Sequence, residues 1–174
     1  MEEEKVILVD KNDFQLGLMP KMEAHKKGVL HRAFSVFIFN STNSLLMQKR
    51  SMVKYHSPGL WTNTCCSHQR DGESTIDAAN RRLMEEMGLA VKINEVFSFI
   101  YRAYLNNSLI EHEYDHVLIG YSDVDPKINI HEVEDWKWMD LKFLEEDLDK
   151  NSNIYTEWFK IIFKKVKNYI HSSN

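Results

Sequence analysis

The chain has 174 residues, a length that fits one globular domain. Hydrophobic residues make up 43% of it, enough to fill one core, and 28% are charged, which suits a soluble surface. The formal net charge is -4, whereas proteins that bind nucleic acid usually carry a basic domain or stripe, so we expect no nucleic-acid partner.

The first residues and the apolar runs of the chain also bear on its expected cellular compartment. The start, Met1-Glu2-Glu3-Glu4, is the opposite of a cationic signal-peptide start, and runs such as 33–39 are too short to span a bilayer. The only two cysteines, Cys65 and Cys66, are adjacent. Neighbouring side chains of a strand point to opposite faces, so such a pair rarely forms a disulfide. We expect a reduced, cytoplasmic protein that binds no membrane.

The first half of the chain is expected to be mostly strands. Apolar runs predict strands at 6–9, 34–39 and 45–49, with turns at 10–13 and 40–43. Residues 61–68 are also expected to be extended. Alternation along this segment puts Thr64, Cys66 and His68 on one face and Asn63, Cys65 and Ser67 on the other.

A helix is predicted after this extended segment. Residues 74–77 (Ser-Thr-Ile-Asp) fit an N-terminal capping box, and Gly88 is a natural stop. The expected apolar stripe of this helix consists of Ile76, Ala79, Leu83 and Met87. Arg82 and Glu86 then lie one turn apart on a neighbouring face.

The second half of the chain adds strands and one more helix. Residues 95–104 and 110–121 are expected to pair as strands around a turn at 105–108, and 134–140 to form another strand. Residues 153–170 have the apolar spacing of an amphipathic helix with a lysine-rich outer face. This mixed order of strands and helices predicts an α/β or α+β sandwich.

Histidines and glutamates supply the first chemical signal. His25 and His31 precede a strand, His68 shares a face with Cys66, and Glu111 and Glu113 project from one side of a later strand. Three imidazoles and two carboxylates would suit Mn²⁺, Fe²⁺, Zn²⁺ or, less well, Mg²⁺. The alternative is that each histidine is a surface or core residue and that the glutamates line a solvated strand face.

The second signal runs from Ser67 through Glu73 to the segment 81–89, Arg-Arg-Leu-Met-Glu-Glu-Met-Gly-Leu. It resembles the Nudix box, whose carboxylates hold Mg²⁺ against a diphosphate. Ser67 replaces the first glycine of that pattern and Arg82 replaces a glutamate. An arginine there opposes a clustered Mg²⁺ site but favours a bidentate contact with phosphate oxygens. A salt-bridged surface helix would explain the charges, though not their match to the whole pattern.

The third signal is the segment 61–68, Trp-Thr-Asn-Thr-Cys-Cys-Ser-His, together with His31-Arg32-Ala33-Phe34-Ser35 and the Glu111-x-Glu113 pair. These residues resemble the type I isopentenyl-diphosphate isomerases of the Nudix superfamily. The likeness runs from about residue 6 to the helix that contains Trp158. It implies a single domain over 1–174, with a Nudix core at about 30–164 and a mixed β-sheet sandwiched between helices, an α/β (α+β) fold.

The resemblance also implies roles for individual residues. Cys66 and Glu113, with Tyr101, match the catalytic groups, and Cys65 matches a non-catalytic neighbour. The metal ligands would be His25, His31, His68, Glu111 and Glu113, with Glu86 holding Mg²⁺ against the substrate diphosphate. The basic residues around the phosphates would be Lys21, Arg50, Lys54 and Arg82, and Trp158 would form an aromatic wall.

The implied reaction moves a carbon–carbon double bond between isopentenyl and dimethylallyl diphosphate through a tertiary carbocation. It needs an acid, a base, a dry pocket and electron-rich walls. Glu113 with Tyr101 is interpreted as the acid and Cys66 as the base, and the reverse reaction would exchange these roles. Trp158, with Trp61 as a second candidate, would face the cation. Trp158 could instead be only a core residue, since it falls on the apolar stripe of its helix.

Two other functions remain alternatives. One is a Nudix hydrolase of nucleoside diphosphate derivatives, against which Arg82 and a cysteine on the active face argue. The other is a non-catalytic diphosphate-binding module, which leaves the joint occurrence of Cys66 and Glu113 unexplained. With no apolar seam evident in the sequence, a monomer that binds only a small isoprenoid diphosphate is expected.

Overall fold

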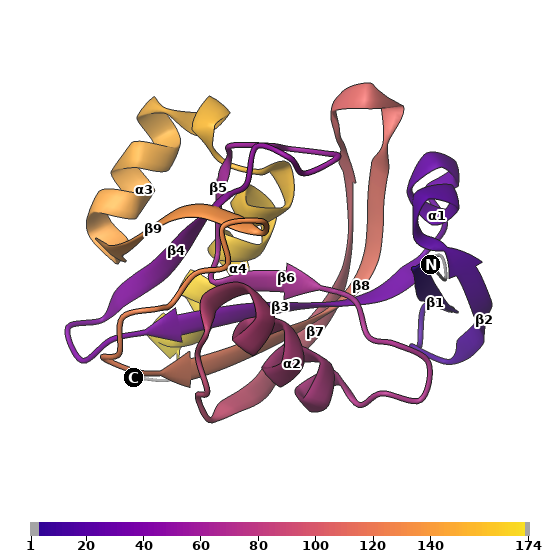
Figure 1. Cartoon of the computed structure of the whole chain (residues 1–174), viewed down its shortest axis with the longest axis horizontal. Helices are drawn as coiled ribbons and strands as arrows, with labels where there is room; N and C mark the ends of the chain where they lie inside the picture. Colours follow the sequence, from indigo (N-terminus) through magenta and orange to yellow (C-terminus); the bar gives the residue numbers. More distant parts are fainter. Residues whose placement is uncertain (1–3, 173–174) are drawn as a thin grey trace.

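The computed structural model describes residues 4–172, so the acidic start at residues 1–3 lies outside the described part. Within that range one mixed sheet contains nine strands (Figure 1). They are β1 (Lys5–Val9), β2 (Gln15–Pro20), β3 (His31–Phe39), β4 (Ser44–Arg50), β5 (Trp61–Thr62), β6 (Cys65–Ser67), β7 (Ile93–Tyr104), β8 (Ile110–Tyr121) and β9 (Val133–Asp140).

Strand β3 is the centre of this sheet. It pairs antiparallel with β1, β4 and β6 and parallel with β8. Strand β8 in turn forms a long antiparallel hairpin with β7, and β9 adds to the other side of β4. The combination of parallel and antiparallel pairs makes the sheet mixed, as the resemblance implied.

Helices lie on both faces of the sheet. They are α1 (Lys21–Lys27), α2 (Thr75–Met87), α3 (Leu141–Lys150) and α4 (Glu157–Ser172), with 3-10 turns η1 (Asn106–Ser108) and η2 (Ser152–Ile154). Figure 1 shows α2 in front of β3 and β8 and α4 behind them. The expected single domain with a sheet between helices is confirmed.

The alternation of β3 explains this layering. Phe34, Val36 and Ile38 are buried in the core cluster that contains the apolar face of α2. Phe37 and Phe39 are buried in the opposite cluster, with Trp158, Phe159 and Ile162 of α4. A strand covered on both faces is apolar at successive positions, so β3 reads as a continuous hydrophobic run.

Helix α2 begins and ends where the sequence predicts. The Ser74 side chain accepts a hydrogen bond from the amide of Asp77, and Gly88 ends the helix in the left-handed conformation. The buried face of α2 differs from the expected apolar stripe, however, because it also includes Ala78. Ala79, Leu83 and Met87 are fully buried as expected, but Ile76 at the border of the stripe is 37% exposed.

The segment 61–68 is not one extended strand, contrary to expectation. It divides into β5 and β6 around a bend at Thr64. The Thr64 hydroxyl accepts from the amide of Ile38 and donates to the carbonyl of Leu46, so a side chain replaces strand hydrogen bonds here. The bend also turns Asn63 to the side of Cys66, whereas alternation had placed them on opposite faces.

Other element boundaries differ as well. Helix α4 begins at Glu157 rather than at 153, because the Thr156 hydroxyl accepts from the amide of Phe159 and caps the helix. Strand β2 and helices α1 and α3 were not predicted. Within residues 4–172, no helix is long and apolar enough to cross a membrane.

Gly88→Ala should lower the free energy of unfolding more than Gly72→Ala does, and Gly17→Ala should leave it nearly unchanged. Gly88 and Gly72 have φ values of 63° and 75°, which cost a residue with a Cβ atom about 1–2 kcal/mol. At Gly88 a Cβ would also lie 2.6 Å from the carbonyl oxygen of Lys127, whereas at Gly72 and Gly17 nothing lies within 4 Å.

Urea unfolding of the three variants, compared at equal m-values, tests this order. Equal losses at Gly88 and Gly72 would show that the Lys127 carbonyl moves away freely.

Candidate active site

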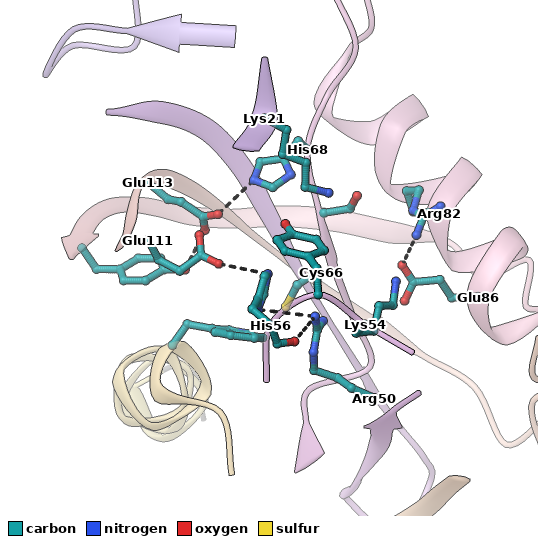
Figure 2. Close-up of a pocket in the computed structure, with 14 residues that line it drawn as sticks. Lys21, Arg50, Lys54, His56, Cys66, His68, Arg82, Glu86, Glu111 and Glu113 are labelled. Atoms are coloured by element: carbon teal, nitrogen blue, oxygen red, sulfur yellow. Dashed lines mark hydrogen bonds and ion pairs between the residues drawn. The ribbon is translucent and has the colours of Figure 1, made fainter. Parts of the chain in front are cut away.

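A cavity opens beside the centre of the sheet, and side chains from distant parts of the chain line it (Figure 2). They come from α1, β4, the loop 51–60, β6 and its following turn, α2, β7, β8 and α4. The lining residues are Lys21, Arg50, Lys54, Tyr55, His56, Cys66, Ser67, His68, Arg82, Glu86, Tyr101, Glu111, Glu113 and Trp158. The cavity therefore brings together most of the site residues that the resemblance implied.

On one side of the cavity, the expected histidines and glutamates form a compact cluster. Ligand atoms of His25, His31, His68, Glu111 and Glu113 all lie within 4.8 Å of one another. The parallel register of β3 and β8 sets His31 directly beside Glu113. A nitrogen and oxygen set of this density suits a divalent transition-metal ion.

Hydrogen bonds behind two imidazoles determine how they face this cluster. His25 Nδ1 lies 2.7 Å from the carbonyl oxygen of Lys21, and His31 Nδ1 lies 2.8 Å from that of Val29. Because a carbonyl only accepts, each Nδ1 must donate. In the neutral rings, Nε2 then presents a lone pair to the cluster.

Those lone pairs face carboxylate oxygens, which are also acceptors. Within residues 4–172, His25 Nε2 and Glu111 Oε2 are 3.1 Å apart, yet neither makes a hydrogen bond, and the same holds for His31 Nε2. Buried acceptors that converge without donors are the arrangement of ligands around a cation, so these residues fit a metal ion.

Protons compete with a metal ion for the same atoms. Burial works against a charge on His25, but the neighbouring Glu111 outweighs it and raises the pKa of this imidazole. For His68, burial dominates and holds the pKa well below its ordinary value. The surroundings therefore shift the pKa values of these two imidazoles in opposite directions.

Glu113 contacts a phenol as well as imidazoles. The hydroxyl of Tyr101 donates to Glu113 Oε2 at 2.6 Å, and His68 Nε2 lies 3.0 Å from Oε1. The register of β7 and β8 places Tyr101 opposite Glu113. Burial raises the pKa of Glu113, but the neighbouring His31 and Tyr101 outweigh it and lower that pKa overall. Burial also raises the pKa of Tyr101, so a phenol donates to a carboxylate.

Cys66, rather than Cys65, faces the cavity, as the alternation predicted. Its thiol lies 2.9 Å from Asn63 Oδ1 and 3.6 Å from the hydroxyl of Ser35. That hydroxyl donates to the fully buried Asp115 at 3.1 Å. Burial, with Asp115 nearby, raises the pKa of Cys66 to about 12, so the side chain is a thiol at neutral pH. Cys65 is buried in the core cluster under α2.

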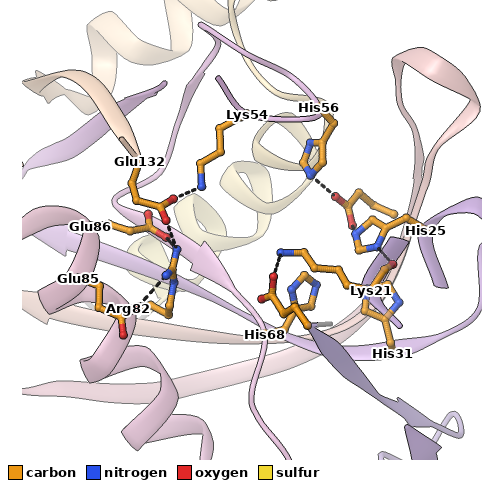
Figure 3. Close-up of polar contacts among 12 residues, drawn as sticks. Lys21, His25, His31, Lys54, His56, His68, Arg82, Glu85, Glu86 and Glu132 are labelled. Carbon is orange, nitrogen blue, oxygen red and sulfur yellow. Dashed lines mark hydrogen bonds and ion pairs between the residues drawn. The ribbon is translucent and has the colours of Figure 1, made fainter. Parts of the chain in front are cut away.

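Cations line the opposite side of the cavity, and carboxylates hold them in place (Figure 3). Arg82 bonds Glu86 at 2.6 Å and lies 3.4 Å from Glu132, which also pairs with Lys54. Nearer the His/Glu cluster, Lys21 pairs with Glu4 at 3.1 Å. Figure 2 shows Cys66 between Glu111 and Glu113 on one side and Arg82 on the other. The cavity thus has a side suited to an anion and a side suited to proton transfer.

The two expected aromatic walls differ in position. Trp158 lines the cavity and packs against the Arg50 guanidinium, whose central carbon lies 5.2 Å from the ring centroid. Trp61 is not among the residues described as lining the cavity. Lys137 Nζ lies 4.2 Å from the centroid of its ring instead. A role for Trp61 in facing the substrate therefore has no support from the cavity.

Comparisons with known proteins agree with this geometry. A NUDIX domain matches residues 29–159. Isopentenyl-diphosphate Delta-isomerase 1 of Aromatoleum aromaticum is 52% identical over 164 residues, which cover 94% of this chain and 93% of that protein. Isopentenyl-diphosphate Delta-isomerase 2 of Photorhabdus laumondii is 52% identical over 160 residues, covering 92% and 90%. The chain belongs to the isopentenyl-diphosphate Delta-isomerase family.

Solved structures support the fold at lower identity. The DR0079 protein of Deinococcus radiodurans superposes with a TM-score of 0.76 at 18% identity, covering 92% of this chain and 98% of that one. The MutT protein of Methanosarcina mazei gives a TM-score of 0.65 at 17% identity, covering 83% and 96%. These similarities show the fold alone.

In this member of the isomerase family, carboxylates of the Nudix-box segment bond arginines. Glu73 binds the guanidinium of Arg81 through both oxygens, at 2.7 and 2.9 Å, and Glu85 bonds Arg82 at 2.7 Å. Of these carboxylates, Glu86 is the one among the described cavity residues. Arg82, which replaces a glutamate of the pattern, therefore pairs with Glu85 and Glu86 in the free protein.

Several residues near the site were not predicted from the sequence. Asp115 continues the alternation of Glu111 and Glu113 on β8, so the period of two could have found it. Tyr55 and His56 directly follow Lys54 in the loop 51–60, but loop residues carry no periodic signal. Glu132 directly precedes β9, and its contact with Lys54 depends on the β4–β9 pairing.

In a Cys65→Ala variant, the rate of Cys66 alkylation by iodoacetamide should rise about tenfold per pH unit between pH 7 and 9.5, because the thiolate is the nucleophile. A pKa of about 12 means that the thiolate fraction keeps increasing throughout this range. An ordinary cysteine, with a pKa of about 8.5, would approach a plateau. A plateau for Cys66 below pH 9 would contradict the raised pKa.

Proposed function

We propose that this chain interconverts isopentenyl diphosphate and dimethylallyl diphosphate. The observation that supports this most directly is the meeting of Cys66 with the Tyr101–Glu113 pair in one cavity whose other side is cationic. In this proposal a single small diphosphate is the only partner, bound by a monomer. The Cys66 thiol must stay reduced, which is consistent with the cytoplasm.

The substrate would bind with its two ends on opposite sides of the cavity. The diphosphate would contact Lys21, Arg50, Lys54 and Arg82, and its five-carbon group would lie between Cys66 and Glu113. The diphosphate is unchanged by the reaction, so its binding supplies free energy remote from the reacting carbons. Arg82 can hold phosphate oxygens through two parallel N–H groups.

The proton transfers balance within the substrate and two side chains. One group gives a proton to the terminal methylene carbon, and the π electrons of the double bond form the new C–H bond. This leaves positive charge on the tertiary carbon. The other group removes a proton from the neighbouring CH2, which lies between the tertiary carbon and the carbon that bears the diphosphate, and the C–H electrons form the new double bond.

Cys66 and Glu113 with Tyr101 are the two groups, and each acts as the acid in one direction of the reversible reaction. The free protein holds a thiol at Cys66 and a carboxylate at Glu113. These forms suit Cys66 as the initial acid, the reverse of the order interpreted from the sequence. Tyr101, 2.6 Å from Glu113, can share the proton that the carboxylate handles.

We further propose that the His/Glu cluster holds Mn²⁺, Zn²⁺ or Mg²⁺ and that Glu86 holds Mg²⁺ with the diphosphate. When bound, the first ion would supply positive charge beside Glu111 and Glu113, and the second would neutralise phosphate oxygens. The lone pairs of His25 and His31 fit the first ion, since both imidazoles are oriented by backbone carbonyls. In the free protein, Glu86 bonds Arg82 and Gln48 instead.

Purified protein given isopentenyl diphosphate and Mg²⁺ should form dimethylallyl diphosphate without releasing phosphate, as followed by proton and phosphorus NMR. Cys66→Ala and Glu113→Gln should each lower kcat by at least about 10²-fold, the scale of a lost acid or base. Cys65→Ala is the matched control and should stay near wild type, because Cys65 is buried under α2.

Circular dichroism of each variant would show that the fold is retained. Released phosphate would favour a hydrolase, and binding without turnover would favour a non-catalytic diphosphate-binding module. An inactive Cys65→Ala with an active Cys66→Ala would contradict the assignment of the thiol.

Trp158→Phe should lower kcat and kcat/KM about equally, by roughly tenfold, with little change in melting temperature. Phenylalanine keeps an aromatic face but is the weaker partner for positive charge that exists only during the reaction. If Trp158 serves only as a core residue, the variant should lose stability through a partly filled cavity and keep its kcat. Steady-state kinetics and thermal unfolding separate the two outcomes.

A further inference from the structure

His56 lies where the parts of the cavity meet, in the loop 51–60. Its ring packs edge-on against Trp158, with centroids 5.4 Å apart, and its Nε2 lies 3.6 Å from Glu111 Oε1. The residue is only 6% exposed. Figure 2 shows its ring pointing toward Glu111 and away from Lys54.

Arg50 determines which nitrogen of His56 carries the hydrogen. One guanidinium nitrogen of Arg50 lies 3.0 Å from the His56 carbonyl oxygen and 3.5 Å from His56 Nδ1. A guanidinium only donates, so Nδ1 accepts and the neutral ring carries its hydrogen on Nε2. That N–H is the one that faces the Glu111 carboxylate.

Glu111 has a ligand side and an outer side. Oε2 faces His25 Nε2 in the cluster, at 3.1 Å, and Oε1 faces His56. Metal-ligating carboxylates are usually oriented by such outer contacts. A separation of 3.6 Å is longer than a hydrogen bond, but polar contacts in active sites often tighten when the ligand binds.

We propose that His56 is a positioning residue that donates its Nε2–H to Glu111 and so holds this carboxylate toward the metal position, in the tautomer set by Arg50. The proposal rests on the proposed function, because it requires the His/Glu cluster to hold an ion. In this proposal one imidazole contacts both Arg50, on the diphosphate side, and Glu111, on the side of the ion. It also explains a buried histidine in the loop 51–60.

The test uses the full chain, stripped of metal by a chelator, and Mn²⁺ alone, with no substrate. His56→Gln and His56→Asn carry the same amide group at two different distances from the backbone. The glutamine nitrogen lies as many bonds from Cα as Nε2 does, whereas the asparagine amide ends at the position of Nδ1. Asparagine can still accept from Arg50 but cannot reach Glu111.

His56→Asn should raise the Mn²⁺ dissociation constant by about tenfold or more, the range for lost outer contacts of a metal ligand. His56→Gln should stay within about threefold of wild type, since its amide can still donate to Glu111. Competition with a chelating dye measures both constants. His171→Asn, an exposed histidine at the end of α4, is the control and should bind Mn²⁺ as wild type does.

Each outcome decides the proposal. Equal losses in the Gln and Asn variants, or an Asn variant that binds Mn²⁺ like wild type, would overturn it while leaving the metal site intact. Wild-type protein that binds no Mn²⁺ would overturn both the metal site and this inference. A melting temperature that rises on adding Mn²⁺, by less for His56→Asn than for His56→Gln, would support it independently of the dye.

Discussion

The site depends on the pairing of β8 with two neighbours at once. The parallel register with β3 sets His31 beside Glu113, and the antiparallel register with β7 sets Tyr101 on its other side. A shift of one residue in either pairing would turn these side chains to the opposite face of the sheet. The apolar cores under α2 and α4 oppose such a shift, since it would change which residues of the sheet pack against each helix.

The distribution of charge across the cavity follows from this frame. Acidic ligands lie on β8, whereas the cations come from α1, α2 and the end of β4 with its loop. Lys21, Lys54 and Arg82 each pair with a carboxylate, so their positive charge is oriented before an anion binds. On the other side, convergent lone pairs without donors are unfavourable until a cation joins them. The site is thus organised for two charged ligands of opposite sign.

The loop 51–60 connects these two sides. It carries Lys54 toward Arg82 and Glu132, and His56 toward Glu111 and Trp158. Its backbone is anchored where the amide of Ser51 bonds the carbonyl of Glu132, and where Arg50 bonds the carbonyl of His56. One short segment therefore positions groups for the anion, the cation and the aromatic wall.

The sequence alone determined the family, the sheet between helices and most of the residues that meet in the cavity. Local signals were sufficient for α2, because its cap at Ser74 and its stop at Gly88 act within one turn. Alternation was sufficient to place Cys66, rather than Cys65, on the side of His68. A motif with fixed spacing extended these signals to residues as distant as His31 and Glu113.

Only the tertiary structure decided what touches what. The bend at Thr64 arises from hydrogen bonds to β3 and β4, which lie far away in the sequence, so alternation misplaced Asn63. The packing of Trp61 on Lys137 of β9 is another contact between segments distant in the sequence. His56, Asp115 and Glu132 join the site through strand pairing and loop closure. Spacing along a chain specifies the face of an element, whereas contacts across elements depend on the packing of the whole core.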